Sequence, residues 1–262
     1  MKNVIFLHFP KTAGQTVHFE LERALGKGNV SPVRVNEQWV LHSIKDLKKY
    51  SLHSGHIDWS LVDFVPEPKI TFTVLRDPLE RIASFYLYLL NKSQSMSDEE
   101  LTYPGNRGLN FVRSVDVNEY FSPKSPDMAE FILSHYDNFY TYFLAGRQYS
   151  ARAKLSAAVI RGDLSPARLV DIAASNAETL NYVADVSTLS TLAEKLTADL
   201  GIPVDFSKTK HNVNKAIGTK RRFETLEGLG LTAENKEKIL KFCEMDYLLY
   251  TELQKREVLI LE

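Results

Sequence analysis

The sequence has a single cysteine, Cys243, among its 262 residues. One thiol excludes an intramolecular disulfide framework and fits a reducing compartment. We interpret Cys243 as a small apolar residue of the last helix. The composition, 44% hydrophobic and 25% charged, is that of an ordinary globular protein. A chain of this length is therefore expected to form one α/β domain over residues 1–262.

The chain also has little net charge, because 32 basic residues stand against 33 acidic ones. Without a global field to attract nucleic acid or an anionic membrane, any anion site must be local. No stretch approaches the roughly 18 uninterrupted apolar residues that are needed to cross a bilayer. We interpret the short apolar start as a first strand rather than a signal peptide. These absences predict a cytoplasmic protein with no nucleic-acid partner and no membrane segment.

Strand-length apolar runs alternate with helical patterns along most of the chain. This alternation predicts an α/β fold with a central, mostly parallel sheet and helices on both faces. In such sheets, ligands bind at the carboxyl ends of the strands. We expect strands at 3–9, near 54–57, at 69–75 and at 182–186, a strand and helix within 33–49, and helices at 17–25, 78–90, 128–145, 151–160, 165–180, 189–200 and 232–253.

Residues 91–125 do not follow this rhythm. They contain NKSQSMSDEE, YPGNRG and SPKSP, which are rich in turn formers and show no sustained periodicity. We expect an irregular insertion here that is mobile or faces the substrate.

The turn after the first strand, PKTAGQT at residues 10–16, has the composition of a phosphate-binding loop. Backbone N–H groups and the helix dipole can face an anion there, and Gly14 lets the backbone approach closely. Lys11 adds a charge, and the hydroxyls of Thr12 and Thr16 add donors. The loop lacks the GxxxxGK[ST] spacing that holds γ-phosphate and magnesium. It predicts a phosphate held without an obligatory metal, with an ordinary strand-to-helix turn as the alternative.

A second anion site is indicated by VLRDPLERIASFY at residues 74–86. Arg76 ends a strand, and Arg81 and Ser84 follow on the next helix. Arg76 and Ser84 can converge on one phosphate, the first by charge and fork geometry and the second by a hydroxyl bond. The alternative is an Arg–Asp pair that caps the helix.

Together these strings resemble the PAPS-dependent sulfotransferases, in the branch that contains the heparan sulfate 2-O- and 6-O-sulfotransferases. PAPS is 3′-phosphoadenosine 5′-phosphosulfate. HFPKTAGQT is similar to the 5′-phosphosulfate loop of that family, and RDPLERIASFY to its 3′-phosphate motif, RDPxxRxxSxY. HSGHIDW resembles the strings around its catalytic histidine, and DNFYTYFLAG resembles its DNxxTxxLAG string. The resemblance implies a P-loop fold like that of a nucleotide kinase.

The resemblance also implies a role for each matching residue in the donor site. Lys11 would hold the bridging oxygen of the transferring group, and Arg76 and Ser84 would bind the 3′-phosphate, while Arg81 would be an ion-pair or shape residue. The basic stretch 208–222 lies where the family has a loop that closes over the nucleotide, with a solvated basic loop as the alternative. The 5′-phosphate would be surrounded by Thr12, Ala13, Gly14, Gln15 and Thr16, and the closing loop would contribute Lys215, Thr219 and Lys220.

His56 is the histidine that aligns with the catalytic base of the family. A base is needed to remove the proton of the acceptor hydroxyl, and imidazole titrates in the useful range. On an extended chain Asp58 shares a face with His56, and orienting it is one option. Trp59 is interpreted as a core residue. His8 and His53 are interpreted as structural.

The resemblance therefore implies a PAPS-dependent sulfotransferase of the EC 2.8.2 type, which passes a sulfuryl group to an acceptor hydroxyl and releases 3′-phosphoadenosine 5′-phosphate (PAP). The branch suggests a saccharide acceptor, and the scheme requires no metal. Two alternatives stay open from the residues alone. One is a P-loop kinase that uses ATP, and the other is a nucleotide- or glycan-binding module without chemistry.

Overall fold

The computed structural model describes residues 2–36, 38, 48–207 and 221–260. The chain divides into two compact units, which are described separately. The sheet unit comprises residues 1–76, 140–213 and 248–262, and the helical unit comprises residues 77–139 and 214–247. Because each unit is discontinuous in sequence, neither is a consecutive domain, and the single domain over residues 1–262 stays a prediction.

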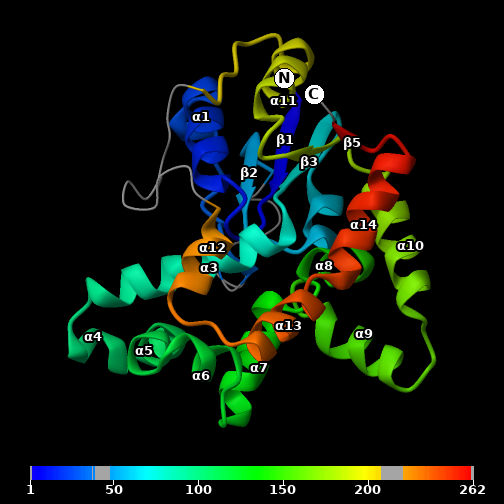
Figure 1. Ribbon diagram of the computed structural model, residues 1–262. Coiled ribbons are helices and arrows are strands. Elements are labelled where there is room, and N and C mark those ends of the chain that lie inside the picture. Colours follow the sequence, from blue (N-terminus) through cyan, green and yellow to red (C-terminus); the bar gives the residue numbers. More distant parts are fainter. Residues whose placement is uncertain (1, 37, 39–47, 208–220, 261–262) are drawn as a thin grey trace. The chain divides into compact units, whose positions relative to one another are not determined.

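A five-stranded parallel sheet forms the centre of the sheet unit (Figure 1). The strand order is β2-β1-β3-β4-β5, and every neighbouring pair is parallel. Strands buried on both faces need near-continuous apolar runs, which β1 and β3 supply. The predicted α/β class with a central parallel sheet is confirmed, although the fifth strand was not predicted. The strands are β1 (Asn3–Leu7), β2 (Leu52–Gly55), β3 (Lys69–Leu75), β4 (Tyr182–Asp185) and β5 (Leu259–Ile260).

The strand order contains a switch point beside β1. The chain leaves β1 for β2 on one side and then returns to β3 on the other side. Connections that diverge in this way open a crevice at the carboxyl ends of the two central strands. The residues that follow Leu7 and Leu75 therefore flank the expected ligand site.

Helices cover both faces of this sheet (Figure 1). Helices α1 (Gly14–Leu25) and α11 (Leu189–Leu200) pack on one face, in a core that contains Phe6, Phe72 and Ala184. On the other side lie α10 (Pro166–Ala177) and α9 (Ala151–Ile160), with the sheet-unit parts of α8 (Phe139–Gly146) and α14 (Glu244–Lys255). Short 3₁₀ turns occur at Lys27–Asn29 and Trp59–Phe64.

The helical unit has its own apolar core, built on the long helix α3. Leu101, Leu109, Tyr120 and Phe121 from the 91–125 stretch are buried in that core. The expectation that this stretch is irregular is therefore wrong, whereas its being an insertion that faces the substrate stays a prediction. The unit contains α3 (Pro78–Gln94), α4 (Asp98–Thr102), a 3₁₀ turn at Pro104–Asn106, α5 (Arg107–Ser114), α6 (Val117–Phe121), α7 (Pro126–Tyr136), α12 (Arg222–Gly228) and α13 (Ala233–Lys241).

The turn formers of the 91–125 stretch are helix caps. Ser97 and Glu100 form a reciprocal capping box at the start of α4. The carboxylate of Asp116 accepts hydrogen bonds from the N–H groups of Asn118 and Glu119 at the start of α6. Helices of five to eight residues are too short to show a clear hydrophobic period. Their capping residues are then the only sign of them in the sequence.

Two of the expected long helices are each interrupted in the structure. Asn138 lies at the first interruption, and it bonds to the backbone at the second. The 128–145 prediction becomes α7 and α8, and the 232–253 prediction becomes α13 and α14. Asn138 has a φ of 42°, and its N–H donates to the carbonyl oxygen of Phe242 at 2.7 Å. Its side-chain oxygen accepts from the N–H of Met245, also at 2.7 Å. It thus supplies the partners that the backbone lacks where one helix stops and the next begins.

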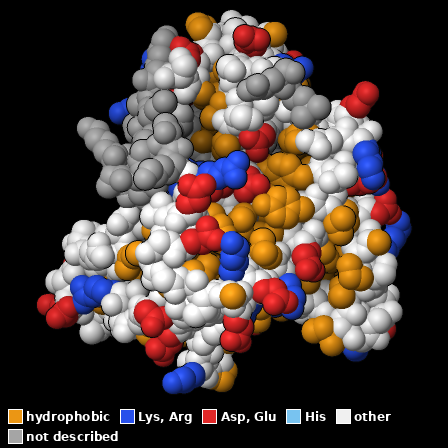
Figure 2. All heavy atoms as spheres, in the orientation of Figure 1, with side chains coloured by type: hydrophobic (Ala, Val, Ile, Leu, Met, Phe, Trp, Pro, Cys, Tyr) orange, Lys and Arg blue, Asp and Glu red, His pale blue; other side chains and the backbone are white. Residues whose placement is uncertain are grey.

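The last features concern the surface and the thiol. Among the described residues, no helix is both long and apolar enough to cross a bilayer. On the face drawn in Figure 2, acidic and basic side chains are interspersed over the described residues, which fits an anion site that is local. Cys243 is buried in the helical-unit core, at the break between α13 and α14, and this burial raises the pKa of its thiol.

Candidate functional site

The loop between β1 and α1 has the backbone of an anion cradle. Lys11 and Ala13 have φ values of 72° and 61°, which is the left-handed region, whereas Thr12 between them does not. Such alternation turns successive N–H groups toward a common side. Ala13 also precedes α1, and no side chain caps the start of this helix. The N-terminus of a helix is where backbone N–H groups can bind an anion. Left-handed non-glycine residues cost about 1 kcal/mol or more each, and such strain gathers at functional sites.

The threonines and glutamine of this loop differ in what they offer. The hydroxyl of Thr12 is buried and donates to the carbonyl oxygen of Phe9 at 2.9 Å. That side chain therefore braces the loop from inside, because its one proton is already used. Thr16 is buried in the first turn of α1, and Gln15 is exposed.

The side chain of His8 leaves room only for glycine at position 14. A Cβ atom at this position would lie 1.7 Å from Nε2 of His8. The start of α1 is thus seated against the imidazole of His8, which only glycine permits. His8 is buried, and its ring stacks on Phe6 of the preceding strand at a centroid distance of 5.3 Å.

The structure brings Arg76 to the same loop from 65 residues away. Its Nη1 donates to the carbonyl oxygen of Lys11 at 3.4 Å. The hydroxyl of Tyr140, from the DNFYTYFLAG string, accepts from the N–H of Arg76 at 3.2 Å and lies 3.1 Å from its carbonyl oxygen. Arg76 follows β3, so Lys11 and Arg76 lie beyond the carboxyl ends of β1 and β3, which meet at the switch point.

The other residues of the RDPxxRxxSxY string belong to the helical unit. Arg81 is buried, and both of its terminal nitrogens donate to the carbonyl oxygen of His135 at 3.0 Å. Its guanidinium also lies over the ring of Phe139. Arg81 therefore holds the end of α7, which fits a shape residue. Ser84 is buried on α3. Since Arg76 and Ser84 lie in different units, their convergence on one phosphate stays a prediction.

His56 is held in one orientation by the backbone of the first strand-loop junction. Its Nδ1–H donates to the carbonyl oxygen of His8 at 2.7 Å, and the two rings stack at 4.4 Å. A histidine that donates through Nδ1 keeps its lone pair on Nε2. Burial lowers the pKa of His56, the His8 carbonyl opposes this shift, and the charge of Arg34 adds to it. The imidazole is therefore neutral at pH 7 and able to accept a proton.

Tyr149 is a site residue that the sequence interpretation missed. Its hydroxyl donates to the same His8 carbonyl oxygen at 2.7 Å and lies 3.4 Å from Nδ1 of His56. Asp58 accepts from the backbone N–H of Tyr149 at 2.8 Å. Asp58 thus holds Tyr149 in place, which is a different role from orienting His56 directly. Nothing in the sequence around Tyr149, which lies 93 residues beyond His56, marks it as a partner.

The remaining aromatic and histidine predictions concern packing. Trp59 is buried beneath the guanidinium of Arg147, which agrees with its interpretation as a core residue. His53 is buried, and its Nε2 lies 3.1 Å from the carbonyl oxygen of Tyr50. Burial lowers the pKa of His53 and holds the pKa of His8 well below its usual value. Both are neutral structural groups, although His8 also positions His56.

Two further basic residues were not predicted: Arg34, whose carbonyl oxygen accepts from the N–H of His56, and His18, which contacts Arg34. Arg34 precedes Val35, which forms a parallel bridge with His56, and Nη1 of Arg34 contacts both ring nitrogens of His18. Residues 33–49 have poor periodicity, and most of the strand and helix expected there lies outside the described residues. The sequence therefore gave no signal for Arg34.

Two parts of the predicted site cannot be placed. Lys215, Thr219 and Lys220 lie outside the described residues. Within the ranges that the structure covers, no group of three or more His, Cys, Asp or Glu side chains is arranged to hold a metal ion. The expectation of chemistry without a metal stays a prediction.

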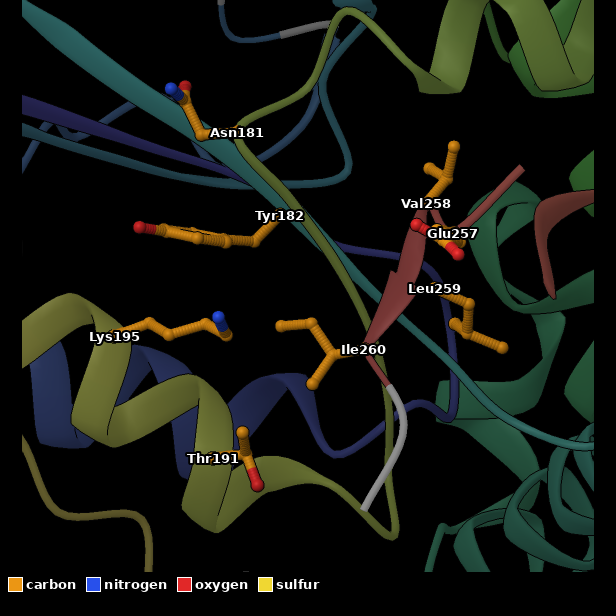
Figure 3. A pocket seen from close by; sticks show the side chains of 8 residues that line it. All are labelled: Asn181, Tyr182, Thr191, Lys195, Glu257, Val258, Leu259 and Ile260. Atoms are coloured by element: carbon orange, nitrogen blue, oxygen red, sulfur yellow. The ribbon is translucent and has the colours of Figure 1, made fainter. Parts of the chain in front are cut away.

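A cavity of about 340 Å³ lies elsewhere in the sheet unit (Figure 3). It is found where β4 and β5 begin, against α11, with Tyr182 and Lys195 facing into it. Ligands of open parallel sheets bind at the opposite, carboxyl ends of the strands. This cavity is therefore separate from the loop at Lys11 and from His56.

Comparison with known proteins gives one family. The model of the Sulfotransferase family matches residues 1–251, which include both anion motifs and His56. No curated protein matches the chain.

Proposed function

The chain belongs to the sulfotransferase family, and we propose that it transfers the sulfuryl group of PAPS to a hydroxyl of an acceptor, with His56 as general base. Sulfuryl transfer is the activity of the family. The donor, the saccharide character of the acceptor and the role of His56 belong to the proposal. The main observation in support of the proposal is that His56 is neutral and is held through its Nδ1. It also lies in the same unit as the strained loop at Lys11.

The residues of the crevice fit a donor that has a phosphate at each end of its ribose. The first N–H groups of α1 and the charge of Lys11 suit a 5′-phosphosulfate. Arg76, which contacts the Lys11 carbonyl, suits the 3′-phosphate, where Ser84 would join it. When bound, PAPS supplies a sulfuryl group that is activated by a phosphate leaving group.

The proposed step is a direct displacement. The acceptor oxygen bonds to sulfur while the bond between sulfur and the 5′-phosphate oxygen breaks. The hydroxyl proton passes to Nε2 of His56, and the released negative charge is stabilised by Lys11 and by the loop N–H groups. Holding both reactants in one crevice supplies much of the acceleration. The scheme forms no covalent intermediate on the enzyme and involves no metal.

Turnover of two variants tests these roles. We expect His56→Ala to lower the rate of sulfate transfer by about 10²- to 10⁴-fold, which is the usual contribution of a general base. PAP binding should persist, because His56 does not hold the nucleotide. Lys11→Ala should lower turnover as well, because it loses the charge beside the leaving group. The measurement is transfer of labelled sulfate from PAPS to a panel of saccharides, with PAP binding followed in parallel.

His53→Ala is the matched control, since it removes a second buried histidine three residues away. It should retain turnover in proportion to its folded fraction. A folded His56→Ala protein that transfers sulfate at nearly the wild-type rate would remove His56 from the mechanism.

Thermal-shift titration separates this proposal from its rivals. A ligand that binds only the folded state stabilises it by mass action, by about 2.7 kcal/mol at one hundred times its Kd. PAP should raise the melting temperature at concentrations where ATP with magnesium does not, because the loop lacks the GK[ST] pair. The reverse order would favour a kinase. Stabilisation by PAP without transfer to any acceptor would favour a binding module.

A further inference from the structure

Tyr140 is a fully buried tyrosine that bonds to the backbone of Arg76 through both of its polar groups. It lies in the first turn of α8, 64 residues away along the chain. Its hydroxyl accepts from the N–H of Arg76 at 3.2 Å and donates to the carbonyl oxygen of Arg76 at 3.1 Å. One hydroxyl can do both, because it has one proton and two lone pairs. A single side chain therefore holds the backbone of Arg76 on both sides of its Cα atom.

The place of Arg76 in the chain explains why its backbone needs such a partner. The pairing of β3 with β4 ends at Leu75 and Asp185, so Arg76 comes directly after the last paired residue. It is also the last residue before the chain leaves the sheet unit, and Tyr140 is the residue at which the chain returns. Backbone polar groups beyond a strand end need partners other than the sheet. The hydroxyl of Tyr140 supplies them at Arg76.

The ring of Tyr140 connects Arg76 to the loop at Lys11. It packs against Phe9 at a centroid distance of 5.2 Å. Phe9 belongs to the same turn as Lys11, and its carbonyl oxygen accepts from the hydroxyl of Thr12. Arg76 reaches this loop as well, because its Nη1 donates to the carbonyl oxygen of Lys11. Tyr140 thus contacts the ends of both strands that lead into the two anion motifs, one through its ring and the other through its hydroxyl.

These contacts bear on the guanidinium of Arg76 and not on a ligand directly. The one proton of the Tyr140 hydroxyl goes to the Arg76 carbonyl, so this group cannot also donate to a phosphate. A guanidinium binds phosphate through a planar fork, which works only when the fork is held in the right place. Binding groups are held most exactly when a second set of packed and hydrogen-bonded residues supports them. Tyr140 is such a support for Arg76.

We propose that Tyr140 is a positioning residue of the donor site, which holds Arg76 in place for the 3′-phosphate and so lets the enzyme prefer PAPS to adenosine nucleotides without that phosphate. This inference rests on the proposed function, because it assumes that Arg76 binds the 3′-phosphate. The family resemblance gave Tyr140 no role, since it stands at an unnamed position of the DNxxTxxLAG string.

The test compares two nucleotides that differ only in the 3′-phosphate, PAP and adenosine 5′-phosphate. Calorimetry, with competition for the weaker ligand, measures both affinities in the wild type and in Tyr140→Phe, which keeps the ring on Phe9. We expect Tyr140→Phe to bind PAP about tenfold more weakly and adenosine 5′-phosphate as tightly as the wild type does. The ratio of the two affinities is the readout, because a general disturbance of the loop would weaken both.

A double-mutant cycle assigns the effect to Arg76. Arg76→Gln should lose most of the preference for PAP, because the charge and the fork are removed. Adding Tyr140→Phe to Arg76→Gln should then weaken PAP binding no further, since the two residues act through one contact.

Tyr120→Phe is the matched control for the loss of a buried hydroxyl. Tyr120 is also fully buried, but its hydroxyl bonds to that of Tyr136 at 2.9 Å in the core of the helical unit. Tyr120→Phe should lose stability in urea unfolding and keep the wild-type ratio of the two affinities.

Other outcomes overturn the inference. A wild-type ratio in folded Tyr140→Phe, equal weakening of both nucleotides, or a further loss in the double variant excludes a role that acts through Arg76. A preference that survives in Arg76→Gln excludes it too, even if Tyr140→Phe does not fold. In each of these cases the wild type still binds PAP and transfers sulfate. Failure of the proposed function is seen instead in the wild type, which would then not bind PAP or not transfer sulfate.

Discussion

The His8 carbonyl oxygen is the point on which the orientation of His56 depends. It accepts from Nδ1 of His56 and from the hydroxyl of Tyr149, each at 2.7 Å. Because a backbone oxygen cannot be removed by substitution, its effect must be tested through its partners. Asp58 offers the test, since it bonds to the backbone N–H of Tyr149.

Two substitutions of Asp58 should therefore differ. Asp58→Asn keeps an oxygen that can accept from Tyr149, so turnover should stay near the wild-type value. The acid limb of its pH–rate profile should not move, because the carboxylate of Asp58 bonds to the backbone of Tyr149 and not to the ring of His56. Asp58→Ala loses the acceptor and should lower kcat by about tenfold, equivalent to about 1.4 kcal/mol. The pH–rate profiles of all three proteins make the comparison.

The result depends on which group Asp58 holds. If Asp58 paired directly with His56, Asp58→Asn would remove a carboxylate that favours the charged imidazole. The acid limb would then shift to lower pH. Such a shift in the folded variant would contradict the contact through Tyr149.

At the site, the sequence predicted the residues that belong to short local motifs. It missed the residues that come together only in the folded chain. Lys11 and Arg76 were recognised because each lies in a short motif that connects a strand to a helix. Tyr149 and Arg34 show no local signal, because their contacts are with residues distant in the sequence. Tyr149 bonds to His8, 141 residues away, and Arg34 contacts His18, 16 residues away. The hydroxyl of Thr12 was expected to be a donor to the ligand, but it donates to the carbonyl oxygen of Phe9 within the loop instead.

Among the elements, the long ones were predicted well and the short ones were not. The 69–75 strand and the 189–200 helix have the expected limits, because each is a strong run of one period. Residues 91–125 misled the prediction because helices of one or two turns show caps but no period. The breaks at Asn138 were invisible, because they depend on contact with Phe242 and Met245 far along the chain.

Asn138 gives a prediction about these breaks. Asn138→Ala should lower the free energy of unfolding by about 2 kcal/mol. About 1 kcal/mol comes from the lost bond to the Met245 N–H and about 1 from placing alanine at a φ of 42°. Asn138→Gly removes the bond but not the conformational freedom, so it should lose only about half as much. Urea unfolding of the three proteins measures the difference.

The two substitutions also separate the causes. Equal destabilisation by alanine and glycine would mean that the left-handed backbone carries no cost here. Stability unchanged in both would mean that the side chain of Asn138 is not what divides the helices.

At the scale of the whole chain, strand order explains why distant motifs can share a site. Returning from β2 to β3 across β1 places the loops after β1 and β3 on either side of one crevice. The sequence predicted a parallel sheet and the loops to inspect. It could not predict the order of the strands. The order depends on which strands pair with each other, and the hydrophobic pattern of a single strand does not identify its neighbour.

The sheet unit also contains four neutral histidines, of which His8, His18 and His53 are buried and His56 is partly buried, and this predicts how stability changes with pH. Burial lowers the pKa of each in the folded protein, in the case of His18 to about 4. The unfolded chain takes up protons near pH 6.5, where the folded protein does not. The free energy of unfolding should therefore fall as the pH is lowered from about 6.5 toward 4.

The carboxylates with lowered pKa values titrate below pH 5.0, and Glu100, with an ordinary value of 4.5, is the first of them to lose its effect as the pH falls. Asp171 and Asp199, whose pKa values are lowered by hydrogen bonds to Arg256 and Lys2, lose their stabilising effect only below their ordinary value of 3.8. Urea unfolding at pH 7.5 and at pH 5.0 should thus give a lower stability at pH 5.0, and His18→Gln should reduce the difference. Equal or greater stability at pH 5.0 would mean that the folded protein protonates these histidines as readily as the unfolded chain does, and His56 would then not be held neutral for its proposed role.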